Sequence, residues 1–179
     1  MGRAATAKKD RLIDAAMRRF HHHGVAASSL AAVANDADVP AGNVYYYFQT
    51  KDQLTDAVVN RWCDRVVDAL ARHEAYPDPL DRVRSFVSYA GDRRQAYTDH
   101  GCPLAAISSH SGRPLDLVRE WIANQFALVD PVSAHARADF TFAALQGSFA
   151  LASAANDCAI IEHSVAHLRH WIDSLSAPI

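Results

Sequence analysis

The fold is decided by the stretch Ser29-Leu-Ala-Ala-Val-Ala-Asn-Asp-Ala-Asp-Val-Pro-Ala-Gly-Asn-Val-Tyr-Tyr-Tyr-Phe-Gln-Thr-Lys51. The spacing of its apolar residues predicts two short helices, over residues 29–37 and 40–48, with a tight turn between them. Ala34 is small enough for the two helices to cross closely. Two short helices joined by a tight turn form a helix-turn-helix.

The second of these helices has a polar, aromatic outer face. Val44 and Phe48 are four residues apart and are predicted to pack inward. This leaves Asn43 and the three consecutive tyrosines that follow Val44 exposed. Tyrosine hydroxyls donate hydrogen bonds to phosphate oxygens, and Lys51 adds a positive charge just past the helix. The pattern is typical of a surface that binds a nucleic-acid backbone.

Helical periodicity continues on both sides of this stretch. A helix over residues 8–23 ends at Gly24, and Thr50-Lys51-Asp52-Gln53 has the form of a capping box that opens a long helix. Further helices are predicted over residues 79–98, 103–110, 112–129, 132–155 and 159–175. Strict alternation over four or more residues occurs only within 44–48. The sequence therefore predicts an all-α fold of about nine helices.

Composition and charge fit a two-domain soluble protein. The chain has 179 residues, of which 50% are hydrophobic and 21% charged. Residues 1–52 carry seven Lys or Arg against five Asp or Glu, whereas residues 53–179 carry eleven against fifteen. A basic front suits a segment that meets an anion. We predict a helix-turn-helix domain over residues 1–50, followed by a second helical domain over residues 51–179.

Residues 8–54 resemble the DNA-binding domain of the TetR family of bacterial transcriptional repressors. The matching residues are Ala15, Ala16, Phe20, Gly24, Ser29, Leu30, Val33, Ala34, Val39, Gly42, Asn43, Val44, Tyr45, Tyr46, Tyr47, Phe48, Lys51 and Leu54. The resemblance implies that residues 1–50 are a DNA-binding domain and residues 51–179 a ligand-binding and dimerisation domain. It further implies a homodimer that reads a palindromic operator in double-stranded DNA, with a pocket for a small-molecule effector in the second domain. Two residues depart from the family pattern. Asp38 replaces the usual turn glycine, and Pro40 replaces the usual serine cap.

The resemblance also implies the residues that touch DNA. Ser29 and Lys51 are expected at phosphates, Asn43 at the backbone, and the tyrosines at the backbone or at thymine methyl groups. Ala41 and Gly42 face the groove but offer few atoms that read bases. The predicted DNA-binding set is Ser29, Ala41, Gly42, Asn43, Tyr45, Tyr46, Tyr47 and Lys51.

The last two predicted helices are apolar on more than one face, so each must be buried on more than one face. A four-helix interface with a second copy of the chain would cover them; a buried hairpin in a monomer is the alternative. The predicted interface consists of Phe140, Ala144, Gly147, Leu151, Ile161, Val165, Leu168 and Ile172.

A ligand pocket is predicted among the aromatic and apolar residues of the second domain: Trp62, Phe86, Tyr89, Cys102, Ile107, Trp121 and Phe126. Cys102 lies between Gly101 and Pro103 at a predicted helix start, two residues from His100, and such a position favours a reactive thiol. The sequence therefore leaves open a second interpretation: a helical small-molecule or redox- or electrophile-sensing dimer whose helix-turn-helix has a role other than DNA binding.

Several function classes are not supported by the sequence. No grouping of side chains suits catalysis, and no cofactor or metal is predicted, because the adjacent histidines 21–23 do not converge on one ion. His163, His167 and His170 share one helical face and are interpreted as packing and surface residues. No apolar run is long enough for a membrane span. The overall prediction is a cytoplasmic, non-enzymatic repressor that a small, mostly apolar ligand releases from DNA.

Overall fold

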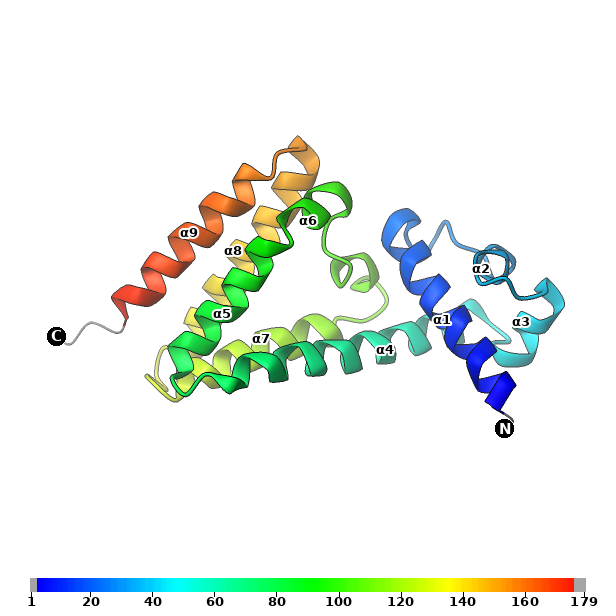
Figure 1. Ribbon diagram of the computed structural model, residues 1–179, viewed down its shortest axis with the longest axis horizontal. Coiled ribbons are helices and arrows are strands. Elements are labelled where there is room, and N and C mark those ends of the chain that lie inside the picture. Colours follow the sequence, from blue (N-terminus) through cyan, green and yellow to red (C-terminus); the bar gives the residue numbers. More distant parts are fainter. Residues whose placement is uncertain (1–2, 176–179) are drawn as a thin grey trace. The chain divides into compact units, whose positions relative to one another are not determined.

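The computed structural model describes the backbone of residues 3–175 and the side chains of residues 5–175. Within that range every regular element is helical (Figure 1). The elements are α1 (Arg3–His23), α2 (Leu30–Asp36), α3 (Ala41–Tyr47), α4 (Lys51–Ala71), η1 (Arg72–Ala75), α5 (Pro79–Asp92), α6 (Arg94–His100), η2 (Ala105–Ile107), α7 (Arg113–Ala127), α8 (Ala134–Ala155) and α9 (Ala159–Ser174). The prediction of an all-α fold with nine α-helices is confirmed for the part of the chain described.

Contacts divide the chain into two compact units. The first contains residues 3–65 and 103–114, and the second contains residues 66–102 and 115–175. Residues 103–114 therefore belong to the first unit, although residues 66–102, which precede them in sequence, belong to the second. The boundary between folding domains at residues 50 and 51 stays a prediction.

The first unit has a continuous apolar core. Phe20 of α1, Val33 of α2 and Val44 of α3 are each fully buried in it. Phe48, Leu54 and Val58 extend this core from the end of α3 into α4. The core fixes the relative positions of α2 and α3, and with them the outer face of α3.

The turn between α2 and α3 has the conformation expected for the residue at its centre. Asp38 has a φ of +51°, in the left-handed region that aspartate enters more readily than most residues. The turn closes with a hydrogen bond from Val39 N to Ala34 O of 2.9 Å. Pro40 precedes α3 and gives it no side-chain cap, as predicted.

The second unit is built around α5, α8 and α9. Helix α9 packs on both α5 and α8, and α6 packs on α8 (Figure 1). Gly91 of α5 permits a close approach, because a Cβ there would lie 3.2 Å from Cγ1 of Val165 in α9. The unit thus has its own core, with Val83 and Val87 of α5 fully buried.

Two predicted helices differ from the structure. The helix predicted over residues 79–98 is interrupted at Arg93, where φ is −101° and ψ is 11°, so α5 and α6 are separate helices. The helix predicted over residues 103–110 is a single 3-10 turn, η2. Gly101, with φ at +70°, and Pro103, which has no N–H to donate, together prevent α6 from continuing into that segment. No helix of the described chain has the length and apolar character that a bilayer crossing requires.

Candidate nucleic-acid interface

The outer face of α3 is held in place by the residues beneath it. Val44 is fully buried and Phe48 is 3% exposed, so α3 cannot rotate without breaking the core. On its opposite side Tyr45 is 55% and Tyr46 74% exposed. The preceding residues Ala41, Gly42 and Asn43 are exposed as well. Tyr47 is half-buried, and the ring of Tyr46 meets it edge to face, with centroids 5.1 Å apart.

Ser29 is exposed at the start of α2, as predicted. Its Oγ accepts a hydrogen bond of 3.1 Å from Ala32 N, so it is the N-cap of this helix. A hydroxyl that accepts a hydrogen bond keeps its own proton for donation. Capping α2 therefore leaves Ser29 able to donate to a phosphate oxygen.

Lys51 has a structural role that sequence reasoning missed. Its Nζ donates to Val25 O at 3.1 Å and to Ala26 O at 3.3 Å, which holds the connection between α1 and α2 against the start of α4. An ammonium has three N–H donors, so one remains after these two bonds. The phosphate contact of Lys51 stays a prediction. The two hydrogen bonds fix the position of the side chain that would make it.

Ion pairs fasten the helices around α2 and α3. Arg19 of α1 pairs with Asp36 of α2 at 2.8 Å. Arg61 of α4 contacts Asp10 of α1 at 2.6 Å and Asp14 at 3.4 Å. Each pair is partly exposed and so contributes only about 0–1 kcal/mol. Their combined effect is to fix the register of α1 against its neighbours.

The capping box before α4 is present. Gln49 N donates to Gln53 Oε1 at 2.9 Å, and Gln53 N donates to Thr50 Oγ1 at 3.2 Å. The side chain at the third position of the box therefore reaches back past Thr50 to Gln49. These bonds satisfy backbone donors at the start of α4, as the sequence predicts.

The residues predicted to line one ligand pocket do not come together. Ile107 is 1% exposed and belongs to the core of the first unit, where Trp62 packs partly buried against the same cluster. A ligand contact for these two residues stays a prediction, now within the first unit. Sequence reasoning could not place them there, because an apolar side chain does not reveal which unit it packs in.

The other predicted ligand residues lie in the second unit, most of them around a buried histidine. His73 of η1 is 7% exposed, and its ring centroid lies 5.8 Å from those of Phe86 and Tyr89 and 6.0 Å from that of Trp121. Burial lowers the pKa of His73, and the Coulombic effect of Arg72 lowers it further. Phe86, Tyr89 and Trp121 thus pack against a neutral imidazole that the sequence did not single out.

Phe126 and Cys102 lie apart from that histidine. Phe126 is fully buried beside the ring of Trp171, with centroids 5.9 Å apart. The Cys102 sulfur accepts a long hydrogen bond of 3.6 Å from Gln146 Nε2. Neither contact indicates a ligand.

The predicted interface residues divide into two groups. In α8, Phe140 is 54% and Leu151 62% exposed, and Gly147 is exposed between them. The four α9 residues are instead buried within the chain, and we correct their assignment to the core of the second unit: Ile161, Val165, Leu168 and Ile172. An apolar stripe predicts burial but does not distinguish a partner chain from the chain's own helices.

Replacing Gly42 with alanine should weaken DNA binding without lowering the stability of the fold. A Cβ at Gly42 would meet nothing within 4 Å, and alanine favours an exposed helix by up to about 1 kcal/mol. We expect a melting temperature that is unchanged or higher, with weaker DNA binding because the methyl group enters the predicted groove face. Thermal denaturation and fluorescence anisotropy measure the two effects. Equal or tighter DNA binding would contradict a close approach of DNA to Gly42.

The first unit has the arrangement of a helix-turn-helix DNA-binding protein. Its residues 12–58 match the family model described as "Bacterial regulatory proteins, tetR family". This part of the chain therefore has the sequence of a TetR-family DNA-binding region.

Relatives and solved structures agree with this assignment. The chain is 34% identical over 77 residues to the HTH-type transcriptional regulator BetI of Burkholderia thailandensis, covering 43% of this chain and 40% of that protein. It is 32% identical over 72 residues to an HTH-type regulator of Xanthobacter autotrophicus, covering 40% and 36%. The chain therefore spans less than half the length of these curated relatives.

Similarity in fold covers nearly the whole chain. A TetR-family regulator from Agrobacterium tumefaciens superposes with a TM-score of 0.81 at 18% identity, over 97% of this chain and all of that one. SCO4454, a TetR-family regulator from Streptomyces coelicolor, superposes with a TM-score of 0.82 at 15% identity, over 96% and 97%. The fold of both units is thus that of these two regulators.

Proposed function

We propose that the protein is a transcriptional repressor that binds a palindromic operator as a homodimer and is released by a small-molecule effector. The observation that carries this proposal is the exposed tyrosine face of α3, anchored from beneath by Val44 and Phe48. Exposed aromatic side chains normally cost solubility, so two on one short helix favour a surface with a function. Their hydroxyls and Asn43 supply donors for a phosphate backbone.

Dimerisation would use the exposed face of α8 together with a different face of α9 from the one predicted. Phe140 of α8 contacts Trp171 of α9, with ring centroids 5.0 Å apart, so the two helices share one outer surface. On α9 the half-buried Ile160 and Trp171 lie on this side. A self-complementary patch of this kind suits a two-fold interface. A dimer would present two α3 helices to successive major grooves, roughly 34–36 Å apart.

Release by an effector requires that the effector bind one arrangement of the dimer better than the other. Linkage then makes the effect reciprocal: operator DNA should weaken effector binding by the same factor by which the effector weakens DNA binding. The second unit is the proposed effector domain, because it has its own core and lies outside the helix-turn-helix.

The proposal is tested by selecting bound sequences from a random duplex pool at two salt concentrations. A palindrome whose recovery falls at the higher salt supports a dimeric DNA-binding regulator. Enrichment of a single half-site would contradict the dimer. No enrichment at either salt, with protein shown to be ligand-free by mass spectrometry after denaturation, would contradict DNA binding itself.

Replacing Lys51 with alanine should weaken both folding and DNA binding. The variant loses two hydrogen bonds to backbone carbonyls, each worth about 1 kcal/mol or more, and the predicted phosphate contact. We expect a lower melting temperature, weaker binding to every duplex, and a salt dependence reduced by about one unit per subunit. Arg169→Ala, which removes an exposed cation from α9, is the control. An unchanged salt slope would leave Lys51 with its structural role alone.

A further inference from the structure

An open cavity of about 410 Å³ runs along α5 in the second unit. Its floor is a polar stripe of the helix formed by Asp81, Ser85, Ser88 and Asp92. These positions follow the spacing i, i+4, i+7 and i+11, which places them on one helical face. A helix rises 1.5 Å per residue, so the two carboxylates at the ends are separated by roughly 16 Å along the axis.

One wall of the cavity is aromatic, formed by His73, Tyr76 and Tyr89. His73 Nδ1 lies 2.9 Å from Ser85 Oγ, which orients the imidazole against the floor. Because burial lowers the pKa of His73, this wall adds no positive charge at neutral pH. The guanidinium of Arg93 lies 4.6 Å from the centre of the Tyr89 ring. The chain's own Arg93 therefore already occupies one face of the Tyr89 ring as a cation–π partner.

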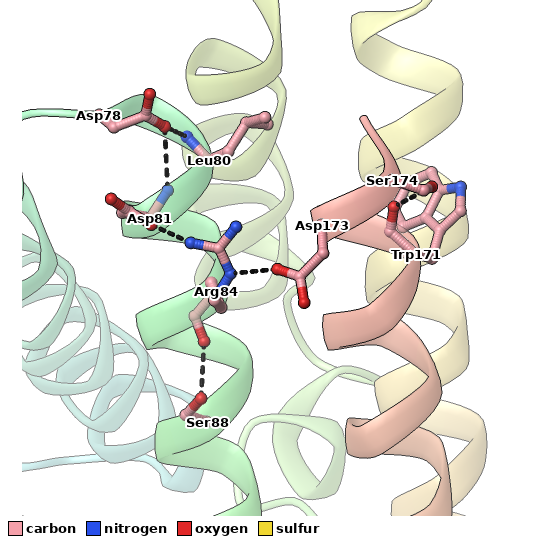
Figure 2. Close-up of polar contacts among 8 residues, drawn as sticks. All are labelled: Asp78, Leu80, Asp81, Arg84, Ser88, Trp171, Asp173 and Ser174. Carbon is pink, nitrogen blue, oxygen red and sulfur yellow. Dashed lines mark hydrogen bonds and ion pairs between the residues drawn. The ribbon is translucent and has the colours of Figure 1, made fainter. Parts of the chain in front are cut away.

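The end of the cavity at Asp81 has more negative than positive charge. Figure 2 shows Arg84 between two carboxylates, with Nη1 donating to Asp81 and Nε donating to Asp173 of α9 at 2.8 Å. Asp78 Oδ1 accepts from the backbone N of Leu80 and of Asp81, which fixes the start of α5 and hence the position of Asp81. One guanidinium shared by two carboxylates leaves this end with a net negative charge.

The other end of the cavity carries a carboxylate without a hydrogen-bond or ion-pair partner in the described chain. Asp92 is exposed, and no residue in the described chain forms a hydrogen bond or ion pair with its side chain. Between the ends, Ser88 Oγ donates to Arg84 O at 2.9 Å, so its lone pairs remain free to accept. The cavity thus offers negative charge at both ends, with hydroxyl acceptors and an aromatic wall between them.

We propose that this cavity binds a linear organic polycation of the polyamine class, with one terminal ammonium at Asp81 and the other at Asp92. Anionic ligands are disfavoured because the lining carboxylates repel them and Arg84 is already paired. A ligand with a single ammonium satisfies only one end. The hydroxyls of Ser88 and Tyr89 accept hydrogen bonds from inner amines, and the aromatic wall covers the methylene groups. The inference concerns the second unit alone and does not depend on DNA binding.

Calorimetric titration of the full chain with spermine, in the absence of DNA, tests the proposal. We expect saturable binding, and we expect Asp92→Asn to weaken it about tenfold by removing one charge-assisted contact. Asp68→Asn, which removes an exposed charge from α4 outside the cavity, is the matched control and should leave the affinity within twofold. Asp92 has no partner within the described chain, so its substitution should not disturb folding. Butylamine, with one ammonium, should bind at least tenfold more weakly than spermine.

Three results would overturn the proposal: no saturable binding of spermine, equal weakening by Asp92→Asn and Asp68→Asn, or equal affinities for spermine and butylamine. Equal weakening by the two substitutions would mean that spermine is attracted only by the overall negative charge. Equal affinities for spermine and butylamine would mean that the site binds a single cation. Operator affinity of Asp92→Asn without spermine is measured in parallel. If Asp92→Asn binds the operator as the wild type does but no longer binds spermine, the cavity site is confirmed. If neither the wild type nor any variant binds an operator, only the proposed repressor function is contradicted.

Discussion

Substitution of both Phe140 and Leu151 by arginine should convert the protein to a monomer and lower its operator affinity on the order of 100-fold or more. The two side chains are 54% and 62% exposed and lie eleven residues apart, hence on one face of α8. An arginine pair on each subunit would place like charges against each other across the proposed two-fold axis. A monomer holds one half-site at a time and loses the advantage of linked binding.

Sedimentation velocity measures the oligomeric state, and fluorescence anisotropy with a full operator and with an isolated half-site measures binding. The matched control is Val132→Arg, at an apolar residue that is 98% exposed before α8 and outside the proposed patch. We expect the control to remain a dimer with wild-type affinity. Affinity for the half-site should be equal for the double variant and the wild type. A double variant that stays dimeric, or a wild type that is monomeric, would contradict the proposed interface.

The helix-turn-helix could be predicted from sequence because its signals are local. Val44 and Phe48 are four residues apart, Ser29 begins α2, and Gln53 completes the capping box, so each feature is read within one turn of helix. In these short helices, local patterns were therefore enough to predict both the helix positions and which side chains are exposed.

The sequence could not predict packing and hydrogen-bond partners that lie far apart in the chain. Ile107 enters the core of the first unit although residues 66–102 of the second unit separate it from the rest of that core, and no periodicity indicates this placement. Lys51 bonds to backbone carbonyls at Val25 and Ala26, and carbonyl acceptors leave no trace in a sequence. Ile161 and its neighbours on α9 were correctly predicted as buried, but the element that buries them depends on how α5 and α8 pack.

The α5 cavity illustrates the same limit for polar residues. Asp81, Ser85, Ser88 and Asp92 form the polar stripe that an amphipathic helix presents to solvent, and sequence alone gives no reason to interpret it otherwise. The tertiary structure adds the wall formed by η1 and the ion pair with Asp173. A solvent-facing stripe becomes a cavity floor only when another element, here η1, packs beside it.

Removing the hydroxyl of Tyr46 should weaken operator binding about 100-fold while leaving the fold intact. Tyr46 is 74% exposed, and its ring contacts Tyr47 edge to face, a contact that phenylalanine retains. A hydrogen bond to a phosphate is charge-assisted and worth about 1.5–3 kcal/mol. A dimer loses two such bonds, a total of at least about 3 kcal/mol, and each 1.4 kcal/mol corresponds to tenfold in affinity.

Fluorescence anisotropy at several salt concentrations checks this value for Tyr46→Phe. The salt slope should not change, because a neutral hydroxyl releases no counterion, whereas the slope of Lys51→Ala should fall. Tyr76→Phe, at a 47% exposed tyrosine of the second unit, is the matched control and should bind the operator as the wild type does. A loss smaller than about twofold for Tyr46→Phe, below the value of even a weak hydrogen bond, would remove Tyr46 from the phosphate contacts and leave the ring itself, against base edges, as its means of contact with DNA.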